Sequence, residues 1–235
     1  MKKQMLGTII ALSLILLMSI AVHAAPKRPP NLPLSWNFDD GSTEGLTVLS
    51  GGWSVVSQQL HVPQGSISLV DKIITVSDPP ANIAATVDMT HINGWTSTGL
   101  LLRYQDALHY YEIAFDNAAS NPQNLPARSL GIYKVSTSPT QLNKLGTWTQ
   151  PDVGSPYLHL LAGRFFPFEF QLNHTYKLRA EVVSSTILVY VDNRLLLSVT
   201  DSDNPYFGGK AGLVAFYTEA TFDNFIIKER KGGGK

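Results

Sequence analysis

The clearest pattern of apolar and polar positions lies in the last third of the chain. From Tyr176 to Val182 every second residue is apolar, and the residues between them are charged. A period of two predicts a β-strand with one buried face. Ser184-Ser185 and Asp192-Asn193 interrupt the pattern as turns, because asparagine tolerates the left-handed backbone of a tight hairpin. Consecutive strands are therefore predicted over residues 176–182, 187–191, 195–199, 211–218 and 221–228.

Short β-rich runs separated by turn residues also fill the earlier part of the chain. They predict strands over residues 34–38, 53–56, 59–62, 67–76, 82–89, 100–105, 110–116, 129–135 and 142–149. Residues 150–167 hold several prolines and glycines, and we expect an irregular excursion that covers one sheet face. Helical periodicity is missing throughout. Many short strands with frequent turns predict an all-β fold, an antiparallel β-sandwich of the jelly-roll kind.

Several of these runs resemble those of a known superfamily. They read Y-K-L-R-A-E-V, I-x-V-Y-V-D-N-R-x-L, G-x-A-G-L and F-D-N-F, and upstream W-x-V, G-L-L-L-R-Y-Q-D and H-Y-Y-E-I. Over residues 34–228 the chain resembles the concanavalin-A-like lectin/glucanase superfamily, with laminin-G-like and carbohydrate-binding modules of secreted bacterial proteins most similar. The resemblance implies the same jelly roll. It leaves the activity open, because the superfamily holds lectins, hydrolases, lyases and adhesion modules.

The first residues have the features of a secretory signal peptide. Lys2 and Lys3 precede an apolar run over residues 6–22, and Val22-His23-Ala24 fits a cleavage site, so we expect cleavage after Ala24 and a secreted or periplasmic protein. An uncleaved anchor is the alternative, although the run is shorter than the ~20 residues that span a bilayer. The predicted organisation is a signal peptide (1–24), a proline-rich linker (25–33), one domain (34–228) and a flexible, basic, glycine-rich tail (229–235).

Charge and cysteine content narrow the possible partners. The chain has 18 basic and 18 acidic residues, and removal of Lys2 and Lys3 leaves 16 against 18. Nucleic-acid binding requires a basic face, so nucleic acid is not a predicted partner. Cysteine is absent, so disulfides cannot stabilise the exported domain. We expect a monomer that does not insert stably into a membrane after cleavage.

Acidic residues near the two ends of the domain suggest a structural calcium ion. Asp39 and Asp40 follow the first predicted strand, and Asp223 lies in the last. The first and last strands of a jelly roll commonly lie side by side, and Ca²⁺ takes six to eight oxygen ligands. The alternative is that Asp39 begins a turn and Asp223 lies at a strand edge.

Aromatic and polar residues provide a candidate carbohydrate-binding surface. A sugar presents an apolar face that suits a flat aromatic ring and a rim of hydroxyls that suits polar side chains. Three aromatic residues lie in predicted loops, and four further residues lie on one predicted hairpin. The predicted carbohydrate-binding residues are thus Trp95, Trp148, Tyr206, Arg103, Gln105, His109 and Tyr111. The alternative for the aromatics is core packing, and for the hairpin residues a buried hydrogen bond.

Catalysis is the less favoured interpretation. Glu112 and Asp116 share a strand face but lie four residues apart, about 13 Å, whereas glycosidase carboxyl groups lie roughly 5–9.5 Å apart. The E-x-D-x-E signature of the superfamily's glucanases is absent. A lyase could use Arg103, Gln105, His109 and Tyr111, but the R-x-x-x-R and Q-I-H signatures of jelly-roll alginate lyases are absent. The predicted function is non-catalytic polysaccharide binding; a polysaccharide-active enzyme and a protein-binding structural or adhesion module are the alternatives.

Overall fold

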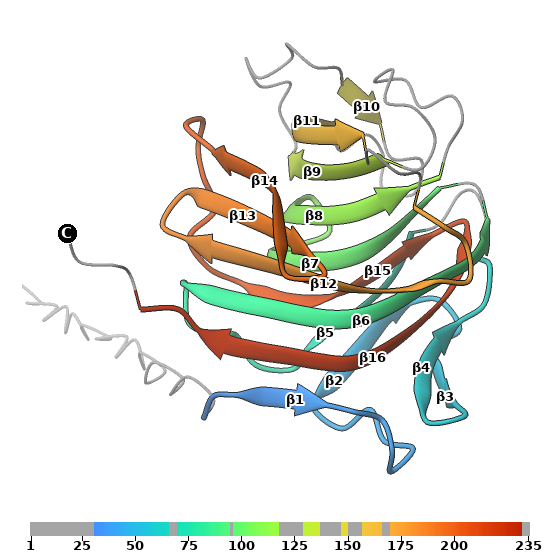
Figure 1. The fold of residues 1–235 in the computed structure, drawn as a ribbon. Coiled ribbons are helices and arrows are strands. Elements are labelled where there is room, and N and C mark those ends of the chain that lie inside the picture. The colour runs from blue at the N-terminus through green and yellow to red at the C-terminus, as the bar shows by residue number, and fades with distance from the viewer. Residues whose placement is uncertain are drawn as a thin grey trace, which may run out of the picture.

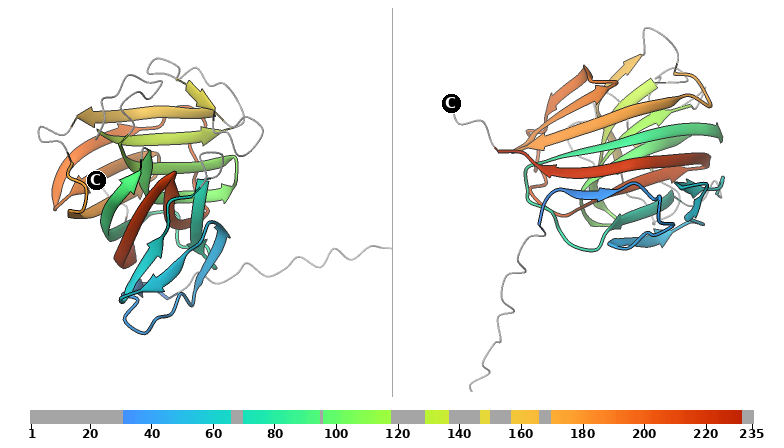
Figure 2. Two further views of the ribbon diagram at one scale, coloured as in Figure 1. Left: turned by 90° about the vertical axis from the view of Figure 1, so that its right-hand side faces the viewer. Right: turned by 60° about the horizontal axis from the view of Figure 1, so that its bottom comes forward.

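Two antiparallel β-sheets pack face to face in the computed structural model (Figure 1). The structure describes residues 31–65, 70–94, 96–117, 129–136, 147–149, 157–165 and 170–231. The predicted all-β antiparallel sandwich is confirmed, and the views in Figure 2 show the two layers along their edges. Within these ranges no helix is long and apolar enough to cross a membrane.

The first sheet holds both ends of the domain. Its strand order is β14-β13-β12-β6-β16-β4-β3, and β1 pairs with β16 beside β4. The strands are β1 (Leu34–Trp36), β3 (Ser54–Val56), β4 (Gln59–Val62), β6 (Ile83–Gly94), β12 (Thr175–Val183), β13 (Thr186–Val191), β14 (Arg194–Thr200) and β16 (Thr218–Glu229). The expected pairing of the first and last strands is confirmed by the antiparallel register of Trp36 with Phe225.

The second sheet has the order β10-β11-β9-β8-β7-β15-β5-β2. Its strands are β2 (Leu46–Ser50), β5 (Val70–Thr75), β7 (Ser97–Asp106), β8 (His109–Asp116), β9 (Ser129–Ser136), β10 (Thr147–Thr149), β11 (Tyr157–Phe165) and β15 (Lys210–Phe216). The loop from Asp201 to Gly209 connects β14 of the first sheet to β15 of the second. It therefore closes one end of the sandwich.

Alternation along the strands separates the core from the outer faces. Leu178 on β12 and Ile113 on β8 are fully buried in the main cluster between the sheets. Tyr110 and Ala114 lie on the other face of β8 and belong to a second buried cluster, on the opposite face of the second sheet. Burial of an apolar side chain contributes roughly 1.5–3 kcal/mol, so each of these core residues stabilises the domain.

Three features of the fold differ from the sequence prediction. Strand β2 was not predicted, because Val48 and Leu49 are both exposed at the sheet edge and the run therefore does not alternate. Strand β6 continues to Gly94, beyond the predicted end of the strand at residue 89. Strand β11 lies inside the stretch expected to be irregular, and a register shift between Leu160 and Ala162 interrupts its pairing with β9.

Candidate functional site

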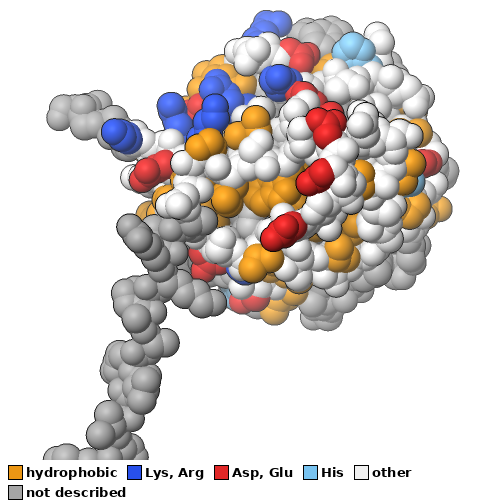
Figure 3. Space-filling view, turned by 90° about the horizontal axis from the view of Figure 1, so that it is seen from below, with side chains coloured by type: hydrophobic (Ala, Val, Ile, Leu, Met, Phe, Trp, Pro, Cys, Tyr) orange, Lys and Arg blue, Asp and Glu red, His pale blue; other side chains and the backbone are white. Residues whose placement is uncertain are grey.

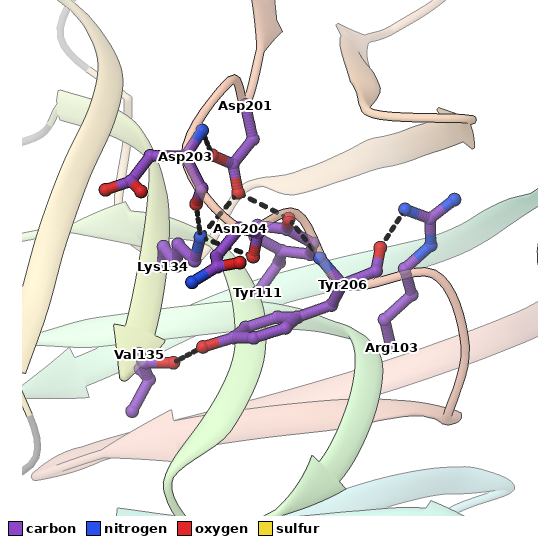
Figure 4. A network of polar contacts seen from close by, with 8 residues as sticks. All are labelled: Arg103, Tyr111, Lys134, Val135, Asp201, Asp203, Asn204 and Tyr206. Atoms are coloured by element: carbon purple, nitrogen blue, oxygen red, sulfur yellow. Dashed lines mark hydrogen bonds and ion pairs between the residues drawn. The ribbon is translucent and has the colours of Figure 1, made fainter. Parts of the chain in front are cut away.

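A buried carboxylate organises the loop that closes the sandwich. Asp201 is 1% exposed and pairs with Lys134, whose Nζ lies 2.8 Å from Asp201 Oδ2 (Figure 4). The Tyr111 hydroxyl donates to the same oxygen at 2.6 Å. The backbone N–H of Asp203 donates to Oδ1 at 3.0 Å. Three donors therefore satisfy a charge that would be costly to bury alone.

Lys134 and Tyr206 hold the middle of the same loop. Lys134 Nζ donates to the carbonyl oxygens of Asp203 and Asn204, the second at 2.9 Å, and lies 4.9 Å from the centre of the Tyr206 ring. The Tyr206 hydroxyl donates to the Val135 carbonyl at 2.7 Å, and its backbone N–H donates to the Tyr111 hydroxyl at 2.9 Å. Burial is the main cause that raises the pKa of both tyrosines, so each hydroxyl stays protonated.

Arg103 ties the end of β7 to two other segments. Its Nη1 donates to the Tyr206 carbonyl, while Nε and Nη2 donate to the Ala81 carbonyl at 3.3 and 2.9 Å. The residue has a φ of 51°, in the left-handed region, and is only 2% exposed. Burial lowers the pKa of the guanidinium, but its ordinary value is so high that it remains charged. Arg103 therefore holds in place the loop that precedes β15.

The network places three of the seven predicted sugar-binding residues inside the protein. Tyr111 is 0% exposed, Arg103 2% and Tyr206 9%, so none offers a free ring face or an open donor row. The alternative of a buried hydrogen bond describes Tyr111 and Arg103. Gln105 is exposed, and His109 is partly exposed with Nδ1 2.9 Å from Asp106 Oδ1.

The remaining two predicted aromatics are described in part or not at all. Trp95 lies outside the described residues. Trp148 is placed only by its backbone, which belongs to β10 at the far edge of the second sheet. Both stay predictions.

A groove opens beside the fixed loop, where β5 and β7 end and β15 begins. Its volume is about 800 Å³, and its lining residues are Val76, Ser77, Asp78, Tyr104, Gln105, Gly208, Gly209 and Lys210. Lys210 Nζ lies 3.2 Å from Asp78 Oδ1, and the Gln105 amide donates to the Gly208 carbonyl at 3.3 Å. Gly209 has a φ of 126°, and a Cβ there would meet the Tyr104 carbonyl oxygen at 2.6 Å. The groove thus combines aromatic, amide and charged groups, and it includes the predicted Gln105.

The predicted calcium ligands lie at the junction of β1 and β16. Burial, followed by the charges of Asp39 and Asp88, raises the pKa of Asp223. Seen from below, acidic side chains form a row across the surface, and basic side chains gather separately (Figure 3). Asp40 accepts the Ser42 N–H within its own turn. Across the described ranges no group of three or more His, Cys, Asp or Glu is arranged to hold a metal ion, so calcium stays a prediction.

A second polar cluster lies on the outer face of the second sheet. Glu112 and Asp116 are 2% and 5% exposed, and the Ser97 hydroxyl donates to Glu112 Oε1 at 3.0 Å. Tyr133 is also buried, and burial followed by the charges of Asp116 and Glu112 raises its pKa well above the ordinary value. The spacing of the two carboxylates along their own strand did not point to the tyrosine, which lies on β9 opposite Glu112.

Lys134 and Asp201 were also missed, although one signal was present. In β9 the residues Leu130 and Ile132 face the core, and the period of two assigns position 134 to the same face. A lysine at a core position requires a buried anion, and Asp201 is that anion.

Comparison with solved structures supports the fold alone. The chain is similar to a carbohydrate-binding module, CBM66, from Bacillus subtilis, with TM-score 0.59, 18% identity and coverage of 79% of this chain and 96% of that one. It is also similar to the exoplasmic/lumenal domain of VIP36 in its Ca²⁺/Man3GlcNAc-bound form, with TM-score 0.60, 12% identity and coverage of 86% and 90%.

A third similar structure is described as a "putative glycosyl hydrolase" from Parabacteroides distasonis, with TM-score 0.52, 12% identity and coverage of 83% and 92%. No protein-family model matches the sequence, and no curated protein matches it. The fold is therefore that of lectin-type jelly rolls, which bind carbohydrate in some members and are described as hydrolases in others.

Proposed function

We propose that the protein is an exported, non-catalytic carbohydrate-binding module that holds a glycan in the groove between β5, β7 and β15. The single observation that carries the proposal is the construction of this groove. Its volume of about 800 Å³ lies within the range of ligand sites, roughly 300–1,000 Å³. Its wall is a loop held by the buried Asp201, Lys134 and Tyr111, so the site is formed before a ligand arrives.

The groove supplies the groups that sugars require. Tyr104 lines the groove although it is only 9% exposed, while Gln105, Ser77, Asp78 and Lys210 provide donors and acceptors for hydroxyl groups. Similarity in fold to a carbohydrate-binding module and to a lectin domain is consistent with this use. A glycan is accordingly the proposed partner.

Steric filling of the groove tests the proposal. A Cβ added at Gly208 would meet no heavy atom within 4 Å, so a leucine side chain at this position starts from open space in the groove lining. We expect the wild-type protein to be retarded in native gels that contain a polysaccharide and Gly208→Leu to migrate as in a blank gel. Ser202→Leu, an exposed position of the same loop, is the control and should behave as wild type. Equal retardation of all three proteins would place binding outside the groove.

A further inference from the structure

Phe207 is an exposed aromatic side chain beside the groove. It is 58% exposed, whereas most other aromatic rings of the described residues are buried. The Arg103 guanidinium carbon lies 5.7 Å from the centre of its ring, so the ring is held from one side. Its chain neighbours are the buried Tyr206 and the groove residue Gly208. A ring that is fixed and still exposed has the properties of a stacking platform.

The charged groups of the groove neutralise each other. Lys210 Nζ is 3.2 Å from Asp78 Oδ1 and also donates to the Val76 carbonyl. One carboxylate and one ammonium therefore leave the lining without net charge. A carboxylate on a ligand would have to compete with Asp78 for Lys210 and would lie close to the charge of Asp78.

Arg103, which contacts the loop beside the groove, cannot replace Lys210 in that role. Arg103 is 2% exposed, and its Nε, Nη1 and Nη2 already donate to the carbonyl oxygens of Ala81 and Tyr206. Building on the proposed function, we infer that the groove selects an uncharged sugar over a uronate. The apolar face of that sugar stacks on Phe207, and its hydroxyl groups bridge Asp78 and Lys210.

The test compares charged and uncharged forms of the same polymer. Binding of the whole protein is measured by gel retardation and titration calorimetry on neutral glucans, mannans, galactans and fructans, on alginate and polygalacturonate, and on fully methyl-esterified polygalacturonate. Each polymer is tested with wild type, Phe207→Ala and Phe207→Tyr. Leu195→Ala is the control, because Leu195 is also exposed but lies on β14 of the other sheet. Melting temperatures should be unchanged in all variants.

We expect binding to a neutral polymer that weakens at least roughly tenfold in Phe207→Ala, while Phe207→Tyr and Leu195→Ala bind as wild type. Tighter binding to polygalacturonate than to its methyl ester would overturn the inference and leave the proposed function intact. If Phe207→Ala binds a neutral polymer as tightly as wild type does, the inference is likewise overturned and the proposed function is left intact. Absence of binding to every polymer would refute both the inference and the proposed function.

Discussion

Removing the buried negative charge at Asp201 should be one of the most damaging conservative changes in the domain. In Asp201→Asn the Lys134 ammonium keeps its charge, its burial and its two carbonyl partners but loses an anion 2.8 Å away. Loss of one partner of a buried ion pair costs about 3–5 kcal/mol. The asparagine oxygen can still accept from Tyr111, so we expect a loss of about 3 kcal/mol in the free energy of unfolding, near the lower limit.

Urea unfolding followed by tryptophan fluorescence measures this loss. Asp203→Asn is a matched control in the same loop, because Asp203 contributes to the network through its backbone N–H and carbonyl; it should change stability by less than about 0.5 kcal/mol. The double variant Lys134→Met/Asp201→Asn should recover part of the loss, since it removes the uncompensated charge. A loss below about 1 kcal/mol in Asp201→Asn would refute the reasoning that this charge is desolvated.

Three further predictions concern pH, metal and export. Burial lowers the pKa of His91 from 6.5 to about 4, so the folded state resists protonation and stability should fall by roughly 3 kcal/mol as the pH drops from 7 to 4; His91→Leu should flatten this dependence in urea titrations. If calcium binds near Asp223, a chelator should lower the melting temperature and added Ca²⁺ restore it. With chelator present, Asp223→Asn should raise the free energy of unfolding at pH 7 by less than about 1 kcal/mol, because the raised pKa of Asp223 shows that its charged form is disfavoured in the folded state. This stabilisation should disappear at acidic pH, where Asp223 of the wild type is itself protonated. Amino-terminal sequencing of exported protein should begin at Ala25, and a start at Met1 in a membrane fraction would contradict cleavage.

The sequence predicted the positions of the strands better than it predicted which face of each strand is exposed to solvent. Alternation located β12 to β16 within a few residues, because each has one face in the core between the sheets. Alternation cannot reveal what covers the other face. Tyr111 was therefore placed on a binding surface, although its hydroxyl donates to Asp201, a residue 90 positions later.

The candidate site could be predicted only in part for a related reason. Gln105 was identified from its own hairpin, but Asp78, Gly208 and Lys210 come from segments far apart in the sequence. They meet because β5, β15 and β7 are neighbours in the second sheet, and that order depends on long-range pairing. Phe207 was not predicted, although it shares the loop context that led to the prediction of its neighbour Tyr206. The sequence does not show which of two adjacent loop aromatics is buried and which is exposed.

Burial of Arg103, Tyr111 and Tyr206 gives these residues a supporting role in the proposed binding site. Arg103 and Tyr111 contact the loop from Asp201 to Gly209 at Tyr206, and this loop forms one wall of the groove and carries Phe207. A loop rich in Asp, Asn, Pro and Gly would otherwise lose conformational freedom when a sugar binds, which costs about 1–2 kcal/mol per ordered residue. Because the network already orders the loop in the folded protein, this free-energy cost arises on folding and not on binding. Substitutions at Asp201 should therefore weaken glycan binding as well as stability, even under conditions in which the domain remains folded.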